Sequence, residues 1–173
     1  MKLLYLLLLP FVLLNATSIP LPQNFTAHFK QMITNPKKKV ITYTGNIRFT
    51  TPSSLKWLYK KPNKKELCVR GHTLIMVDYD LEQVVHLVID KGFDFIKVLK
   101  RATLHHKDVF VSHYKEQKYT IKLNKKKEIE SVAYFDNLDN KVQIIFTEVH
   151  YGKGKLPSST MQCKVPKHFD IIK

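Results

Sequence analysis

The chain has 173 residues and a formal net charge of +15, from 29 Lys and Arg against 14 Asp and Glu. No Gly/Ser linker, internal repeat or low-complexity segment divides it, which excludes a string of small modules and favours one domain with a sizeable core. The positive balance suits an anionic partner, whether nucleic acid, an anionic membrane surface or an acidic protein.

The N-terminus opens with an apolar run that carries a single charge, at Lys2. Its apolar part is about ten residues long, whereas a membrane-spanning helix needs roughly 20. The pattern predicts a secretory signal peptide over residues 1–16, cut after Ala16, and a single domain over residues 17–173. A buried core helix fits less well, because the run is uniformly apolar and two prolines follow. Export also argues against a nucleic-acid partner.

Four apolar residues recur at helical spacing early in the exported chain: Phe25, Phe29, Met32 and Ile33. Asn24 precedes them and could cap a helix. We therefore expect a short amphipathic helix over residues 22–33, packed by its apolar face on the sheet that follows.

Beyond residue 40, apolar and polar residues alternate, and Pro, Gly or clusters of Asn, Asp and Lys punctuate the pattern. A period of two predicts antiparallel strands with one apolar face. We expect strands at residues 40–50, 54–60, 65–70, 73–78, 83–89, 108–114, 117–123, 128–136, 140–150 and 168–172. Many strands in one domain predict a mainly β fold, either a barrel or a strongly curved sheet.

The segment from Lys91 to Arg101 breaks the alternation and predicts a short helix over residues 94–101. Phe95, Val98 and Leu99 share one face of that helix, because they are spaced three and four residues apart. A helix inserted into a meander of strands covers or plugs the sheet, so this segment is a candidate lid.

Known catalytic motifs are absent from the sequence, including G-x-S-x-G, the P-loop and G-x-G-x-x-G. His105 and His106 are adjacent, so on a strand they point to opposite faces and cannot share a metal. Asp78 and Asp80 are typical of a turn at a strand end. The sequence therefore predicts no enzyme, no metal site and no cofactor.

The two cysteines, Cys68 and Cys163, lie in separate strand-like segments. In an oxidising compartment they could pair, or they could remain two buried thiols that behave as small hydrophobes. The separation of their Cα atoms decides between these forms and cannot be obtained from sequence. We slightly favour the unpaired form.

Three stretches of sequence together suggest a family. The first is Phe25-x-Ala27-x-Phe29-x-Gln31, and the longest runs from Tyr43-x-Gly45-x-Ile47 through Pro52, Leu55-x-Trp57-x-Tyr59 and Pro62 to Asp78-x-x-Leu81-x-Gln83-Val84. The third is the C-terminal segment that ends at Ile172. This order of strands and punctuation resembles the outer-membrane lipoprotein carrier family (LolA) over nearly the whole exported chain.

The resemblance implies an incomplete, unclosed antiparallel β-barrel with an N-terminal helix and a short lid helix. It also implies a monomeric periplasmic chaperone without a cofactor. Such a carrier accepts lipidated lipoproteins from an inner-membrane ABC transporter complex and delivers them to an outer-membrane acceptor. Because the first cysteine is Cys68, the mature N-terminus is not acylated, unlike that of the related acceptor lipoprotein (LolB).

The chain departs from the family pattern at three places. Thr51 stands where the family has an Arg before the Pro, Ile75 and Val77 replace a Trp and a Tyr, and Cys163 replaces a Phe. The family's Arg is thought to hold the lid shut. We therefore expect closure here to rest mostly on apolar contacts of the lid helix.

The candidate acyl-chain site consists of apolar residues in excess of what a simple sheet needs: Ile47, Phe49, Leu55, Trp57, Ile75, Phe95, Val98, Leu99, Val142, Ile144 and Phe146. Each could equally belong to an ordinary core. The alternative function is a secreted, non-enzymatic half-barrel module with a closed core, which binds an acidic protein or an anionic membrane surface through its lysines. The two hypotheses differ in whether an apolar site stays open.

Overall fold

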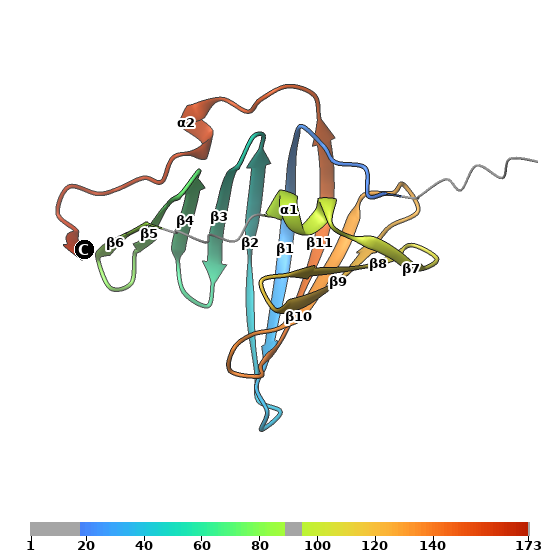
Figure 1. The fold of residues 1–173 in the computed structure, drawn as a ribbon. Helices are drawn as coiled ribbons and strands as arrows, with labels where there is room; N and C mark the ends of the chain where they lie inside the picture. The colour runs from blue at the N-terminus through green and yellow to red at the C-terminus, as the bar shows by residue number, and fades with distance from the viewer. Residues whose placement is uncertain (1–17, 89–94, 173) are drawn as a thin grey trace, which may run out of the picture.

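The computed structural model describes residues 18–88 and 95–172. Within them, one continuous sheet has the strand order β12-β6-β5-β4-β3-β2-β1-β11-β10-β9-β8-β7 (Figure 1). The strands are β1 (Asn24–Thr34), β2 (Val40–Thr50), β3 (Ser54–Lys61), β4 (Lys65–Arg70), β5 (Thr73–Asp78), β6 (Gln83–Val88), β7 (Thr103–His106), β8 (Val109–Tyr114), β9 (Gln117–Leu123), β10 (Ile129–Phe135), β11 (Lys141–Gly152) and β12 (Asp170–Ile172). Because β12 and β7 are separate edges, the predicted unclosed, mainly β fold is confirmed.

The segment predicted as an N-terminal helix is the strand β1, so that prediction was wrong. β1 lies in the middle of the sheet and pairs antiparallel with both β2 and β11. Phe25, Ala27 and Phe29 are buried, whereas His28 and Lys30 are exposed, which is the alternation of a strand. Phe25 and Phe29 are four residues apart, a spacing that fits both periods, and the two partner strands decide between them.

The other predicted strands are confirmed to within about two residues at each described end. Two described elements were not indicated by the sequence: the short helix α2 (Ser158–Met161) and the edge strand β7, whose four residues are all exposed. The predicted lid is α1 (Phe95–Lys100), and its expected first residue, Asp94, lies outside the described residues. So does residue 89, the expected end of β6. No described helix has the length and apolar character needed to cross a bilayer.

Gly45 allows β1, β2 and β3 to approach one another closely. A Cβ atom at this position would lie 1.9 Å from the carbonyl oxygen of Leu58 and 2.9 Å from the ring of Phe29. No side chain fits there without moving the backbone of β3. The register between β2 and β3 also shifts between Thr44 and Gly45. The glycine in the Tyr43-x-Gly45 motif is therefore required by close packing inside the curved sheet.

The sheet has an inner face, which carries the main core, and an outer face. The core gathers inward residues from β1, β2, β8, β9, β10 and β11, and α1 lies over them in Figure 1. The ring of Phe95 packs 5.6 Å from that of Phe25 and 6.1 Å from that of Phe49, measured between centroids. The position of α1 over the inner face is thus fixed by contacts with the two central strands.

The C-terminal residues 153–172, which we call the strap, run from the end of β11 to the far edge of the sheet. Arg48 of β2 donates to the carbonyl of Thr160, and Lys56 of β3 donates to that of Gln162. The strap ends in β12, which pairs in parallel with β6. It therefore crosses β2 to β6, and its strand β12 covers the edge that β6 would otherwise leave unpaired.

Candidate functional site

Strands β3 to β6 form a wing of the sheet whose inner face presents two apolar rows. Directly opposed residues of antiparallel strands share a face, so the cross-strand register defines each row. One row runs Trp57, Leu67, Met76, Val85, and the next runs Leu55, Val69, Leu74, Leu87. The inner face of the wing is therefore lined by eight apolar side chains.

The second row becomes more exposed with distance from the centre of the sheet, and the first row is partly exposed throughout. Leu55 is 5 % exposed, the residues of β4 and β5 are partly exposed, and Leu87 on β6 is 46 % exposed. A contiguous, partly exposed apolar surface of this kind marks an interaction or ligand site. The wing thus offers apolar surface that the described residues leave only half covered.

The other half of the sheet keeps its inner face closed. Phe110, Ile121 and Val132 occupy one row across β8, β9 and β10, and none is more than 5 % exposed. From α1, Phe95, Val98 and Leu99 are buried against this core, as the sequence predicted for one face of the helix. This half is filled by its own side chains and offers no comparable open surface in the described residues.

Ten of the eleven predicted site residues belong to one cluster on the inner face: Ile47, Phe49, Leu55, Trp57, Phe95, Val98, Leu99, Val142, Ile144 and Phe146. All but Trp57 are buried in the core, and Trp57 is partly exposed where the core meets the wing. The predicted set therefore comprises buried residues at the centre of the inner face and the residues of α1 that pack on them.

The eleventh predicted residue, Ile75, lies apart from the rest on the outer face. It pairs with Cys68, whose neighbours Leu67 and Val69 point inward. The stretch from 74 to 77 is apolar throughout, so its sequence does not reveal which residues face which side. Sequence reasoning therefore missed the open part of the wing: Leu67, Val69, Leu74, Met76, Val85 and Leu87. The spacing of two between Leu67 and Val69 in β4 contained the signal for the first two.

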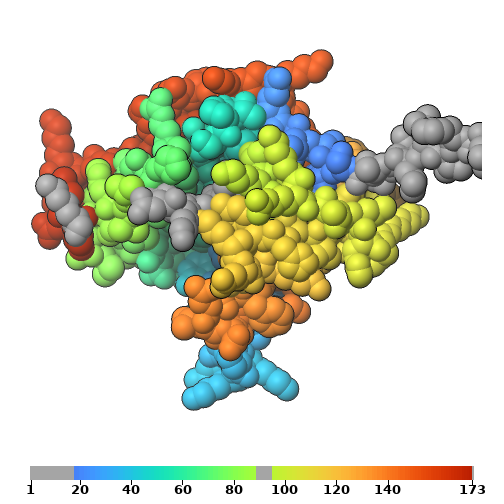
Figure 2. Space-filling view, in the orientation of Figure 1, coloured from blue at the N-terminus to red at the C-terminus, as the bar shows by residue number. Residues whose placement is uncertain are grey.

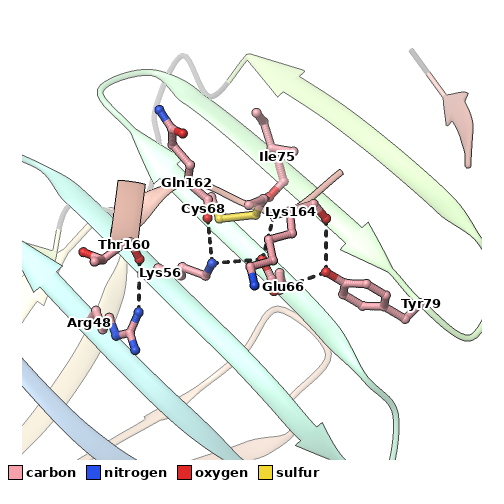
Figure 3. A network of polar contacts seen from close by, with 10 residues as sticks. Arg48, Lys56, Glu66, Cys68, Ile75, Tyr79, Thr160, Gln162 and Lys164 are labelled. Atoms are coloured by element: carbon pink, nitrogen blue, oxygen red, sulfur yellow. Dashed lines mark hydrogen bonds and ion pairs between the residues drawn. A yellow bond between two sulfur atoms is a disulfide. The ribbon is translucent and has the colours of Figure 1, made fainter. Parts of the chain in front are cut away.

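The outer face of the wing is covered by the strap through a buried polar network (Figure 3). Lys56 Nζ lies 3.0 Å from Glu66 Oε2, and both side chains are less than 10 % exposed. Lys56 also donates to the carbonyl of Gln162 at 2.6 Å, and the backbone N–H of Lys164 donates to Glu66 at 3.0 Å. The strap thus supplies the hydrogen bonds that a buried ion pair needs.

The same carboxylate also accepts a hydrogen bond from the phenol of Tyr79, at 3.2 Å. Partial burial, together with the negative charge of Glu66, raises the pKa of Tyr79 to about 12. The phenol therefore keeps its proton at neutral pH and can donate. Its oxygen lies 3.1 Å from the carbonyl of Lys164 as well, which places it between β4 and the strap.

Cys68 and Cys163 form a disulfide, which corrects the expectation that the thiols are unpaired. The strap brings Cys163 over β4, so that the two Cα atoms lie 5.8 Å apart, within the usual range for a disulfide. Val77 and Val84, which lie in the same outer row as Glu66, are fully buried. The outer face of the wing is therefore a second, smaller core, locked by a covalent bond.

Tyr59, on the inner face where β3 meets the core, remains neutral. The phenol of Tyr59 donates to Gln31 Oε1 at 3.0 Å. Burial, and secondarily the nearby phenols of Tyr134 and Tyr43, raises the pKa of Tyr59 above its usual range. This tyrosine thus adds no charge to the apolar surface at physiological pH.

The expected role of apolar contacts in holding α1 is consistent with its surroundings. Thr51, at the position of the family's Arg, lies in the β2–β3 turn, and its N–H donates to the carbonyl of Gln23 at 2.9 Å. Just after α1, the guanidinium of Arg101 lies 5.7 Å from the ring centre of Tyr114 in β8. The cation–π contact supplements the burial of Phe95, Val98 and Leu99.

Potential metal ligands come together at one place among the described residues. The single described group with several potential ligands is Glu66, Cys68 and Cys163, and both of its sulfurs are consumed by the disulfide. Asp78 ends β5, where its carboxylate accepts hydrogen bonds from the N–H groups of Asp80 and Leu81, as a turn residue does.

Comparison with known proteins gives consistent matches. The family model described as "Outer membrane lipoprotein carrier protein LolA" matches residues 22–158. The outer-membrane lipoprotein carrier protein of Campylobacter jejuni is 31 % identical over 149 residues, covering 86 % of each chain. That of Wolinella succinogenes is 30 % identical over 123 residues, covering 71 % of this chain and 72 % of its own.

A crystal structure supports the fold. An uncharacterized conserved protein from Thermus thermophilus superposes with a TM-score of 0.56 at 10 % identity, covering 88 % of this chain and 91 % of its own. At that level of identity the likeness concerns architecture alone.

Proposed function

Because this chain belongs to the outer-membrane lipoprotein carrier (LolA) family, we propose that it is a periplasmic chaperone that carries lipoproteins to the outer membrane. The cargo is a lipidated protein whose acyl chains need shelter from water during transit. Such sheltering involves no covalent chemistry and no cofactor. Family membership favours this function over a closed module that binds an acidic partner.

The observation that supports the proposal most directly is the half-covered apolar face of the wing. Eight apolar side chains line it, and exposure increases from Leu55 to Leu87. Each CH₂ group of a bound acyl chain that leaves water contributes roughly 0.8 kcal/mol. Burial of several carbons from each chain of a triacylated lipoprotein therefore supplies a large share of the favourable binding free energy.

Release is explained by competition between cargo and the lid. The buried residues of α1 cover apolar surface of the inner face, next to the wing. Acyl chains that extend from the wing toward the core displace part of this contact, so the free energy of binding is reduced by the cost of moving α1. The carrier thus binds strongly enough for transit and weakly enough for transfer.

The remaining parts of the proposal follow from the family and the N-terminal sequence. Residues 1–16, which lie outside the described residues, act as a signal peptide that directs the chain to the periplasm. There the protein works as a monomer. It receives cargo from an inner-membrane ABC transporter complex and transfers it to an outer-membrane acceptor.

The test is purification from a periplasmic extract, followed by mass spectrometry of co-eluting lipidated proteins. Leu87→Glu places a charge on the exposed inner face of β6, where it opposes acyl-chain burial. His86→Glu is the matched control, because His86 is also exposed but lies on the outer face of the same strand. We expect Leu87→Glu to lower lipoprotein recovery by about tenfold or more, and His86→Glu to leave it unchanged. Equal lipoprotein recovery with the two variants would show that the inner face of the wing does not bind the acyl chains.

A further inference from the structure

The β1–β2 hairpin projects from the body of the molecule. β2 begins at Val40, but its pairing with β3 begins only at Thr44. At about 3.4 Å per residue, the hairpin extends roughly 14 Å beyond β3 before its turn is counted. Figure 2 shows this hairpin as a narrow protrusion, with the chain around residue 138 beside its base.

The turn that closes the hairpin is well defined. The N–H of Asn35 donates to the carbonyl of Lys39, the N–H of Lys38 donates to that of Asn35, and the Asn35 side chain accepts from the N–H of Lys39. Pro36 occupies the second position, and Lys38 has a positive φ of 62°. This is a turn followed by a left-handed residue, a common hairpin connection, so the protrusion has a fixed shape.

Large apolar side chains are exposed at this end of the sheet. Val40 and Ile41 on β2 are 56 % and 52 % exposed, and Phe135 and Leu138 at the β10–β11 connection are 59 % and 76 % exposed. Register places Val40 and Phe135 in one cross-strand row, separated by Thr34 and Lys141. We call residues 35–41 and 135–141 the tip.

Lysines surround these apolar side chains. Lys37, Lys38 and Lys39 are exposed, and none of the three forms an ion pair with another described residue. Lys141 is exposed in the same row as Phe135. Asp136 and Asp139 reduce the local charge, but the four lysines of the tip outnumber these two carboxylates. The tip therefore keeps a positive excess beside its apolar side chains.

We propose that the tip binds an anionic phospholipid surface. The side chains of Val40, Ile41, Phe135 and Leu138 enter the headgroup region, and Lys37, Lys38 and Lys39 lie against lipid phosphates. Apolar side chains beside lysines are the combination that holds a protein at a membrane interface. This inference goes beyond the carrier function, because it locates the surface through which the protein rests on a membrane.

A lipid surface suits the tip better than an acidic protein does. The tip is narrow and convex, whereas a stable protein interface of standard size needs about 800 Å² on each partner with complementary shape. A bilayer deforms around a small protrusion and needs no matching groove. The overall charge of +15 also favours approach to an anionic surface.

The chain contains a matched control for the lysine cluster. The β9–β10 turn, residues 124–128, repeats the hydrogen bonds of the β1–β2 turn, with Asn124 in the first position and Lys127 at a φ of 63°. It also carries three consecutive lysines, but lies at the opposite end of the sheet, where Lys127 pairs with Asp108. The two turns thus share backbone and lysine count and differ in their apolar neighbours.

The test measures binding to vesicles of phosphatidylcholine with 30 % phosphatidylglycerol, and to pure phosphatidylcholine, by co-sedimentation. The protein is used without residues 1–16, because that apolar segment would itself enter lipid. We expect binding to the anionic vesicles, weakened by about tenfold or more in Lys37→Glu/Lys39→Glu. Lys125→Glu/Lys126→Glu makes the same charge change elsewhere and should weaken binding far less. Thermal unfolding confirms that both variants fold.

A second pair of measurements tests the apolar part. Val40→Ser/Ile41→Ser should weaken vesicle binding without changing net charge, and a tryptophan in place of Leu138 should shift its emission to the blue on anionic vesicles. Equal weakening by both glutamate pairs would overturn the proposal, because binding would then follow total charge. Absence of vesicle binding would also overturn it. If poly-glutamate binding then depended on Lys37 and Lys39, the tip would be a site for an acidic protein.

Discussion

The two halves of the sheet use opposite faces to form their cores. From β1 through β11 to β8, the inner face is filled, and residues such as Ile121 and Val132 are almost wholly buried. In the wing, the outer face is buried instead, with Val77 and Val84 fully covered, while the inner face is only partly covered. Because the wing buries its outer face, its apolar inner face is available for a ligand.

This contrast explains how the wing stays folded while the described residues leave its inner face only partly covered. A sheet must bury one face to be stable, and the strap supplies that cover from outside through the disulfide and the Lys56–Glu66 pair. The inner face of the wing therefore does not need to be covered for the sheet to remain folded. Stability in the wing comes from the strap, and binding comes from the opposite side.

The largest effect is expected where the strap covers the wing. Lys56→Met leaves Glu66 buried without its partner and should destabilise the protein by about 3–5 kcal/mol. The double variant Lys56→Met/Glu66→Leu removes both charges and should recover much of the loss. Urea denaturation of the single and double variants measures both. A single variant as stable as the unmodified protein would show that the outer face is not a core.

A matched pair of leucines compares the two inner faces directly. Leu123 is 3 % exposed in the closed half, and Leu123→Ala should cost about 2–5 kcal/mol of unfolding free energy. Leu74 is partly exposed on the wing, and Leu74→Ala should cost about 1 kcal/mol or less. Similar losses at both sites would mean that the wing is as tightly packed as the rest.

The disulfide should matter for stability but less for the shape of the inner face. It joins residues 95 apart in sequence, and Cys68→Ala/Cys163→Ala should lower the unfolding free energy by roughly 2–4 kcal/mol. Acyl-chain binding, measured with an apolar dye in the folded variant, should change little, because both cysteines face outward. Loss of dye binding at full folding would mean that the strap shapes the site itself.

The smallest expected effect is on pH dependence. Burial opposes ionisation of Asp78, but hydrogen bonds from Lys65 and from the N–H of Leu81 outweigh it and hold the pKa of Asp78 below its usual value. Its stabilising contribution is therefore complete above the unfolded pKa, near 4, and is lost as the pH falls through the lower folded value. Asp78→Asn should remove on the order of 1 kcal/mol at pH 7 and almost nothing at pH 2. A constant difference across that range would contradict this account.

Much of the fold could be predicted from periodicity, because strands with one buried face leave a period of two in the sequence. The parts of the fold that were not predicted correctly from the sequence have physical causes. β1 was mistaken for a helix because residues four apart coincide in both periods. β7 has one apolar residue in Thr103–His106 and therefore no pattern. The strap has no regular structure over most of its length, so its course and the disulfide follow from contacts that are distant in sequence.

Only part of the candidate site was predicted, because that prediction also depended on a clear alternation of apolar and polar residues. Apolar residues of the inner face were identified where alternation is clear, as in Leu55 and Trp57. In β5 every residue from 74 to 77 is apolar, because the strap buries one face and the other is the candidate binding surface. The sequence therefore showed that the strand is apolar but could not assign Ile75 to the outer face.

Hydrogen exchange with and without a synthetic triacylated lipopeptide tests the central claim most directly. If the inner face of the wing binds acyl chains and α1 yields to them, amides of β4, β5 and β6 should exchange more slowly when the lipopeptide is bound. Amides of Phe95–Lys100 should exchange faster, because the helix loses part of its apolar contact. Strands β8 to β10 should be unchanged. Unchanged exchange in both the wing and α1, with the lipopeptide demonstrably bound, would contradict the account.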